Sequence, residues 1–387
     1  MPLPDYKGNS IVNLMSSLGN AMGYSHRYPE LSALKSKELS DSRNIILIII
    51  DGLGYHFLKE RKNTSFLQKG LRARMTSVFP STTASAIPVF LTGEAPQQHG
   101  LTGWYMLLRE LGAVAATLPF SLRTGRASLG KLEDLRYSFS ESSFPSKINR
   151  RSSYILPIEI KDTAFTQATS KNSERNGYTT LNGFIRQIKS AAEARRKKGK
   201  KKYVYAYYPG LDNKGHHFGM NSPEAKEEFW NIDKAIKTLI ERIEGSNSTV
   251  IITGDHGQKD TDKSRTIWLD KHPKLKECLS MPLCGEPRVR YCYVHPSKTK
   301  DFKYYVRNKM SHICWMHESE DLIKKGYFGM YKPHPELTHR VGDFILIMKE
   351  NYILRDKKPG KKSKILIGNH GGISKEEMFV PLITFRV

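Results

Sequence analysis

The sequence predicts an α/β protein, a three-layer α/β/α sandwich around a mostly parallel sheet with inserted cap regions. The main observation is a set of apolar runs that each end at an acidic or histidine residue, at 44–51, 203–212 and 248–256. Continuous Ile, Val and Tyr without polar alternation is typical of strands buried on both faces, as in parallel sheets. Between two of these runs, residues 181–192 carry apolar side chains at steps of three and four, which indicates an amphipathic helix.

Two stretches fit this layout poorly, and we expect them to be insertions. The first has weak periodicity and many Ser, Arg and Phe residues, and the second mixes short strands with one helix. Apolar runs at 343–348 and 364–372 then indicate a return to the core. The expected division is core at 1–103, 181–270 and 339–387, a cap-like insertion at 104–180, and a small α/β insertion at 271–338.

Composition excludes several classes of protein. The 387 residues are 39% hydrophobic, which is enough to bury a large core and is unlike a disordered polybasic chain. The longest apolar runs have only the length of strands, so we expect no membrane span. The N-terminal residues lack a basic segment followed by an apolar stretch, so we expect no secretory signal and a cytoplasmic location. The four cysteines form no CxxC pair and are expected to be free thiols.

The chain is strongly basic, with 62 Lys and Arg against 38 Asp and Glu and a net charge of +24. Two basic runs, 195–202 and 357–362, are expected to be a solvated helix end and a solvated loop. The alternative is a partner rich in phosphate such as a nucleic acid, although neither run contains an aromatic residue for base stacking. The basic excess is better interpreted as a field that steers an anionic substrate inward.

Acidic and histidine side chains gather at the ends of the expected strands. In open α/β sheets, ligands bind beyond the carboxyl ends of the strands, so these side chains are expected near one another. A mixture of carboxylates and imidazoles without thiolates suits a catalytic zinc or a similar divalent metal. Six ligands are enough for two metal ions that each keep an open position. They are Asp51, Asp212, His216, Asp255, His256 and His370.

Three neighbouring hydroxyls, Ser81, Thr82 and Thr83, follow a turn that contains proline and precede an apolar stretch. A hydroxyl at a helix N-terminus lies among free N–H groups, where a phosphoryl oxygen would be held beside it. Ser and Thr are also the commonest N-cap residues, so this segment alone leaves a nucleophile and a simple cap both open.

The order of these motifs resembles the type I phosphodiesterase/nucleotide pyrophosphatase branch of the alkaline phosphatase superfamily. The matching blocks are an apolar strand ending in DG, a Thr-containing turn followed by LTGEAPQQHG, then GLDNKGHHFG, TGDHGQ and NHGG. The resemblance covers residues 44–100, 203–258 and 364–382 and implies an alkaline phosphatase-like fold. It also implies two divalent metal ions, with zinc expected and manganese or magnesium as alternatives, and a Thr or Ser that attacks phosphorus.

Carried over by position, the resemblance assigns the metal ligands in two sets. One zinc would take Asp212, His216 and His370. The other would take Asp51, Asp255, His256 and the oxygen of the nucleophile.

The family spacing, nine residues before Thr92, places the nucleophile at Thr83. Matching on the Phe-Pro pair instead gives Val78, which has no hydroxyl, and Thr82 is kept as the reserve nucleophile and as a substrate-binding residue. Trp104 stands where many nucleotide-cleaving relatives have an Asn, so it is expected either to stack on a base or to pack within the cap. Arg288 and Arg340 are candidates for holding phosphate, and structural pairing is the alternative for each.

The expected function is that of a metal-dependent phosphohydrolase acting through a phosphothreonine at a two-zinc site. The expected reaction is phosphodiesterase or nucleotide pyrophosphatase activity on an anionic phosphate compound such as a nucleotide. The alternatives are a phosphomonoesterase or phosphonate hydrolase on the same fold, or an inactive basic protein that binds phosphate or nucleic acid. A sulfatase is disfavoured because neither CxPxR nor SxPxR occurs.

Overall fold

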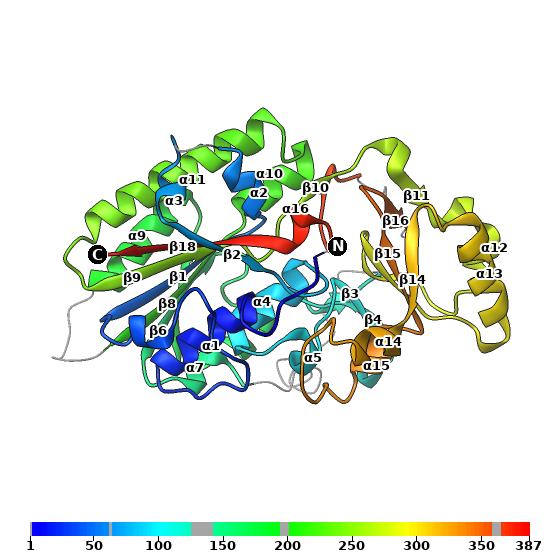
Figure 1. Ribbon diagram of the computed structural model, residues 1–387, viewed down its shortest axis with the longest axis horizontal. Coiled ribbons are helices and arrows are strands. Elements are labelled where there is room, and N and C mark those ends of the chain that lie inside the picture. Colours follow the sequence, from blue (N-terminus) through cyan, green and yellow to red (C-terminus); the bar gives the residue numbers. More distant parts are fainter. Residues whose placement is uncertain (1, 62–63, 125–141, 194–200, 358–364) are drawn as a thin grey trace.

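The computed structural model describes residues 2–61, 64–124, 142–193, 201–357 and 365–387, which form two sheets side by side (Figure 1). The larger sheet has seven strands in the order β2-β18-β9-β1-β8-β6-β7. The five strands from β9 to β7 are parallel, and β18 runs antiparallel to both of its neighbours. The strands are β1 (Asn44–Ile50), β2 (Leu71–Thr76), β6 (Arg151–Pro157), β7 (Ser173–Tyr178), β8 (Lys202–Tyr208), β9 (Ser248–Thr253) and β18 (Phe379–Arg386).

Helices cover both faces of this sheet, which confirms the predicted α/β/α sandwich (Figure 1). Alternate residues of β1 point to opposite faces, so Ile45, Leu47 and Ile49 join one apolar cluster while Ile46, Ile48 and Ile50 join the other. The first face carries α1 (Ile11–Ala21), α4 (Thr83–Thr92), α7 (Phe144–Lys147) and α8 (Ala164–Thr169), and α5 (Pro96–His99) contacts α4. The second carries α2 (Tyr55–Lys59), α3 (Phe66–Lys69), α9 (Leu181–Glu193), α10 (Gly210–Phe218) and α11 (Pro223–Arg242).

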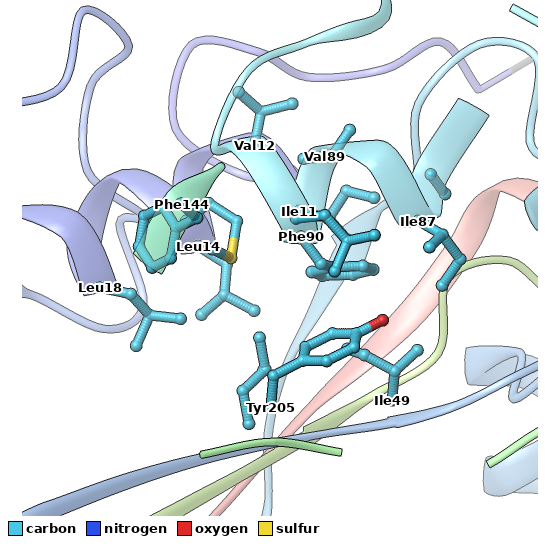
Figure 2. Packing of buried hydrophobic residues seen from close by; sticks show 14 of the residues in the cluster. Ile11, Val12, Leu14, Leu18, Ile49, Ile87, Val89, Phe90, Phe144 and Tyr205 are labelled. Atoms are coloured by element: carbon cyan, nitrogen blue, oxygen red, sulfur yellow. The ribbon is translucent and has the colours of Figure 1, made fainter. Parts of the chain in front are cut away.

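The packing of α4 on the sheet holds the start of this helix in place. Figure 2 shows Phe90 of α4 between Ile11 of α1 and the strand residues Ile49 and Tyr205. All four side chains are at most 1% exposed. Burial of a side chain of this size contributes about 1.5–3 kcal/mol, so the helix cannot shift along the sheet without losing several such contributions.

The smaller sheet has seven strands in the order β14-β15-β13-β12-β3-β4-β5, and all the pairs are antiparallel. They are β3 (Tyr105–Leu108), β4 (Ala113–Ala116), β5 (Ser121–Leu122), β12 (Cys284–Glu286), β13 (Val289–Cys292), β14 (Cys314–Glu318) and β15 (Phe344–Met348). Its helices are α12 (Pro273–Lys276), α13 (Thr299–Lys309), α14 (Ser319–Lys324) and α15 (Leu337–Arg340), and α16 (Lys375–Met378) precedes β18. Two short pairs, β10 (Lys259–Asp260) with β17 (Gly368–Asn369) and β11 (Thr266–Trp268) with β16 (Ile353–Arg355), complete the strands.

The placement of three segments differs from the expected division of the chain. The strands β6 and β7, expected within the insertion at 104–180, lie in the larger sheet, and β15, expected in the core, lies in the smaller one. Of the apolar run expected at 364–372, the described residues 365–372 provide only the two-residue β17, and Ile367 is 40% exposed. The reason is that the local pattern of a strand indicates whether it is buried but not which sheet it joins. In addition, β6 contains the polar residues Ser152 and Ser153, which are buried although their type suggests exposure.

The structure tests the expectations for the cysteines and for a membrane span, but most of the two basic runs lies outside the described residues. All four cysteines are free and buried. Among the described residues, no helix has the length and apolar character needed to cross a membrane. Residues 195–200 and 358–362, which make up most of the two basic runs, lie outside the described residues.

Candidate active site

The predicted acidic and histidine residues converge at the carboxyl edge of the larger sheet. Asp51 directly follows β1, Asp212 lies in the first turn of α10 after β8, and Asp255 follows β9. Because β1, β8 and β9 are parallel neighbours, their ends meet at one edge. Gly52 makes the approach possible: its φ is +77°, and a Cβ there would lie 3.1 Å from the Cα of Asp212.

One cluster contains Asp212, His216 and His370. The first two are four residues apart on α10, which puts both side chains on one face, with His216 Nε2 3.2 Å from Asp212 Oδ2. The Nε2 atoms of His216 and His370 are 3.2 Å apart, and His370 Nε2 is 4.0 Å from Asp212 Oδ1. Two imidazole nitrogens and a carboxylate therefore face one point.

A second cluster surrounds His256. Its Nε2 is 3.4 Å from Asp51 Oδ1 and 3.4 Å from Asp255 Oδ2. The hydroxyl oxygen of Thr83 is 3.0 Å from the same nitrogen. The Asp212 carboxylate also belongs here, because Asp51, Asp212 and His256 each offer a ligand atom within 4.8 Å of the others. All six predicted metal ligands thus lie together with Thr83, and Asp212 reaches both clusters rather than one.

The electrostatics of the site suit divalent cations. Asp51 Oδ1 and Asp255 Oδ2 are buried and have no hydrogen-bond partner among the described residues. Burial, together with the neighbouring Asp212 and Asp255 carboxylates, raises the pKa of Asp51 well above its usual value, and burial also raises that of Asp255. Burial and the nearby His256 and His216 lower the pKa of His370, so this imidazole is neutral and able to donate a lone pair. The residues therefore fit divalent metal ions.

The histidine rings are oriented by backbone carbonyls. His216 Nδ1 is 2.8 Å from the carbonyl oxygen of Gly368, and His256 Nδ1 is 3.0 Å from that of Gly257. Each contact assigns the proton to Nδ1 and leaves Nε2 free to bind a metal ion.

Two further side chains position the carboxylates, and sequence reasoning missed both. The Gln258 amide donates to the backbone carbonyl of Asp212 at 3.0 Å and also to its carboxylate. The Tyr207 hydroxyl donates to Oδ2 of Asp51. The available signals were the Gln that follows TGDHG and the position of Tyr207 just before the end of β8.

The structure separates the two candidate hydroxyls. Thr82 is the N-cap of α4, and its hydroxyl donates to Glu286 Oε1 at 2.8 Å. Thr83 is the first helical residue and contacts His256. The backbone N–H of Trp104 also donates to Glu286 Oε1, at 2.7 Å, and the Trp104 side chain is only partly buried. No local pattern marks Glu286, because its role depends on where β12 pairs in the smaller sheet.

A cavity of about 710 Å³ opens beside the Asp and His clusters, between the two sheets. It is lined by Thr83, Trp104, apolar side chains and three arginines. The apolar lining includes Ile87 and Leu91 of α4, Leu156 of β6 and Phe165 of α8.

Neither arginine proposed from the sequence as a phosphate ligand lines this cavity. Arg288 pairs with both oxygens of Glu377, at 3.0 and 2.9 Å. Arg340 pairs with Glu110 at 2.8 Å. Structural pairing, the alternative considered for each, is therefore what the structure shows.

The α/β/α sandwich and the Asp and His clusters at its strand ends together define a protein with a candidate metal site. Comparison with known proteins identifies the family. The model of the type I phosphodiesterase/nucleotide pyrophosphatase family matches residues 45–373. The chain belongs to this family, which confirms the family expected from the motifs.

The individual relatives cover the chain to different extents. An uncharacterised pyrophosphatase/phosphodiesterase of Schizosaccharomyces pombe is 36% identical over 77 residues, 19% of this chain and 16% of the relative. The catalytic subunit of mouse GPI ethanolamine phosphate transferase 3 is 30% identical over 96 residues, 24% of this chain and 8% of the relative. The chain thus matches less than a fifth of the length of either.

Two solved structures share the fold over most of their length. Murine ectonucleotide pyrophosphatase/phosphodiesterase 5 has a TM-score of 0.66 at 17% identity and covers 87% of both chains. The human protein of the same name has a TM-score of 0.65 at 18% identity and covers 88% of both chains. An inactive variant of the murine protein in complex with AMP superposes equally well, with a TM-score of 0.66, 17% identity and 87% coverage of both chains.

Proposed function

We propose that the protein is a metal-dependent hydrolase of phosphodiester or pyrophosphate bonds that uses Thr83 as its nucleophile. One observation carries this proposal: the Thr83 hydroxyl lies 3.0 Å from His256 Nε2, at the edge of two carboxylate–imidazole clusters that share Asp212. A satisfied helix cap would place its hydroxyl over its own helix, whereas Thr83 faces the clusters.

In the proposed site, Asp212, His216 and His370 would hold one zinc ion. Asp51, Asp255 and His256 would hold the other. When bound, such ions make a neighbouring hydroxyl or water more acidic and offset negative charge on the reacting phosphate.

The residues of the chain then set the geometry of the reaction. The Thr83 hydroxyl loses its proton, Thr83 Oγ1 attacks phosphorus, the ester or anhydride oxygen leaves with its electron pair and takes up a proton from solvent, and a phosphothreonine forms. Attack of water on this intermediate breaks the bond between phosphorus and Thr83 Oγ1 and restores the hydroxyl. The N–H groups that begin α4, those of Thr83 and Ala84, would be available to the phosphoryl oxygens, a role that suits the N-terminus of a helix held by a buried core.

A nucleotide is the substrate that we propose, because a structural neighbour binds AMP. Trp104 lines the cavity and offers a flat surface for a base. A phosphomonoesterase or a phosphonate hydrolase on the same fold is the second candidate, because such enzymes would need the same metal ligands.

Hydrolysis of bis(p-nitrophenyl) phosphate and p-nitrophenyl phosphate by the zinc-loaded protein tests this proposal. We expect faster turnover of the diester, loss of at least about a thousandfold in kcat for Thr83→Ala, and little change for the neighbouring control Thr82→Ala. The metal chelator EDTA should abolish turnover. Full activity of Thr83→Ala would refute the nucleophile, and preference for the monoester would favour the second candidate.

A further inference from the structure

The cavity contains three arginines that the proposed chemistry does not use. Arg123 follows β5, Arg290 lies on β13 and Arg355 ends β16, so three separate segments bring guanidinium groups to one space. Arg290 is 4% exposed and Arg123 7%. Burial of positive charge is costly unless acceptors are provided, so the partners of each group decide its role.

Arg123 already has its partners. It forms an ion pair with Asp356 at 2.5 Å, donates to the carbonyl of Leu283, and lies 4.8 Å over the ring of Tyr105. This arginine therefore braces the wall of the cavity.

Arg290 and Arg355 keep free donors. Arg290 Nε donates to the carbonyl of Leu354 at 2.6 Å, and its two terminal nitrogens have no hydrogen bond to any residue that the structure describes. Arg355 Nη1 is buried and likewise without a partner in the described part of the chain. Burial lowers the pKa of Arg290 to about 10, so it still carries its charge at neutral pH.

The carboxylates nearby do not use these donors. Asp356 contacts Arg123, and Glu286 accepts from Thr82 and from the Trp104 backbone. Glu159 also lines the cavity but is exposed. Asp356 and Glu286 stabilise the Arg290 charge electrostatically, but the described acidic groups form no hydrogen bond with the terminal nitrogens of Arg290 or with Arg355 Nη1, which leaves these donors for a ligand.

These donors lie close to the proposed nucleophile. Arg290 pairs with Gly285 across β12 and β13, and the next residue, Glu286, accepts the hydroxyl of Thr82. Thr82 directly precedes Thr83, and Thr83 lines the same cavity as Arg290 and Arg355. A single ligand can therefore reach both.

We propose that Arg290 and Arg355 form a subsite for a second phosphate group carried by the same substrate as the scissile phosphate. The inference rests on the proposed function and names its substrate class: a diester or anhydride that bears another phosphate. Guanidinium groups match phosphate because their planar N–H donors form paired, charge-assisted hydrogen bonds with it.

Calorimetric titration of the zinc-loaded protein tests this subsite without requiring turnover. The probes are butanediol, hexanediol and octanediol bisphosphate, each compared with the alkyl monophosphate of the same length. We expect at least one bisphosphate to bind wild type about tenfold or more tightly than its monophosphate. The Arg355→Gln variant should lose about tenfold for that bisphosphate, the effect expected from losing charge-assisted hydrogen bonds, and should bind the monophosphate like wild type.

Two further variants separate the subsite from general charge effects. Arg265→Gln removes an equal charge outside the cavity, where Arg265 contacts Glu350 at 2.8 Å, and should bind both probes like wild type. Arg355→Lys keeps the charge and should recover part of the bisphosphate preference.

Each outcome of these titrations decides the inference. Equal binding of bisphosphates and monophosphates by wild type, or equal losses for both probes in Arg355→Gln, would overturn the subsite. If Arg265→Gln and Arg355→Gln weaken the bisphosphate preference equally, the preference arises from the overall positive charge of the protein. That result would also overturn the subsite. A bisphosphate preference that depends on Arg355, in a protein that hydrolyses no diester, would support the subsite while refuting the proposed function.

Discussion

Replacement of Glu377 by Gln should destabilise the fold and loosen the metal site together. Glu377 is fully buried and binds Arg288, itself 1% exposed, through two hydrogen bonds of 3.0 and 2.9 Å. One Glu377 oxygen also accepts the backbone N–H of Gly372 at 2.8 Å, which fixes the turn just after His370. The same ion pair therefore joins the smaller sheet to a metal-ligand loop.

The size of the effect follows from the charge that the substitution strands. Removal of one partner of a buried ion pair costs about 3–5 kcal/mol because the other charge stays buried and unpaired. Gln keeps the shape and one acceptor, so for Glu377→Gln we expect about 3 kcal/mol, the lower end of this range. The matched control is Glu376→Gln, whose partially exposed pair with Lys259 at 3.3 Å should contribute less than about 1 kcal/mol.

Urea unfolding at neutral pH measures this difference, and zinc titration measures its effect on the site. Burial alone would raise the pKa of Glu377, yet Arg288 holds it below its usual value. The ionised Glu377 therefore stabilises the folded protein at any pH above the usual pKa of Glu. That stabilisation is lost as the pH falls through the lower pKa of Glu377 in the folded protein. The difference in free energy of unfolding between wild type and Glu377→Gln should therefore become smaller at acid pH. A loss below about 1 kcal/mol at neutral pH, or unchanged zinc affinity, would refute the reasoning.

Two other predictions concern the ligands themselves. Gln258→Leu removes the donor that orients Asp212, so it should weaken zinc binding about 10–100-fold and leave the protein folded. Titration with a competing chelator measures the zinc affinity. An unaltered affinity would contradict the orienting role of Gln258. The raised pKa values of Asp51 and Asp255 mean that protons compete with metal ions, so zinc affinity should fall as pH is lowered from neutral. Titrations across pH check this sign, and affinity that rises toward acid would exclude these carboxylates as ligands.

The sequence predicted which acidic and histidine side chains gather at the strand ends better than it predicted which sheet receives each strand. Asp51, Asp212 and His256 could be found because parallel strands end at a common edge, so a residue's position after an apolar run fixes its location. The same logic fails for β15, whose apolar run suits a buried strand of either sheet. The strand β6 was missed because its polar residues lie near its start, where a local pattern suggests a loop.

Long-range pairing explains the residues that no motif indicated. Glu286 reaches Thr82 because β12 joins the smaller sheet beside β3, a pairing between segments about 180 residues apart. Arg290 and Arg355 face the same cavity for the same reason. Such contacts depend on which strands become neighbours, and periodicity does not encode that choice.

Anomalous X-ray diffraction from zinc-soaked crystals tests most directly whether a paired metal site lies at the end of the larger sheet. We predict two peaks about 4 Å apart. One peak should lie among Asp212, His216 and His370, and the other among Asp51, Asp255 and His256 beside Thr83. A single peak, or peaks away from these side chains, would contradict the account.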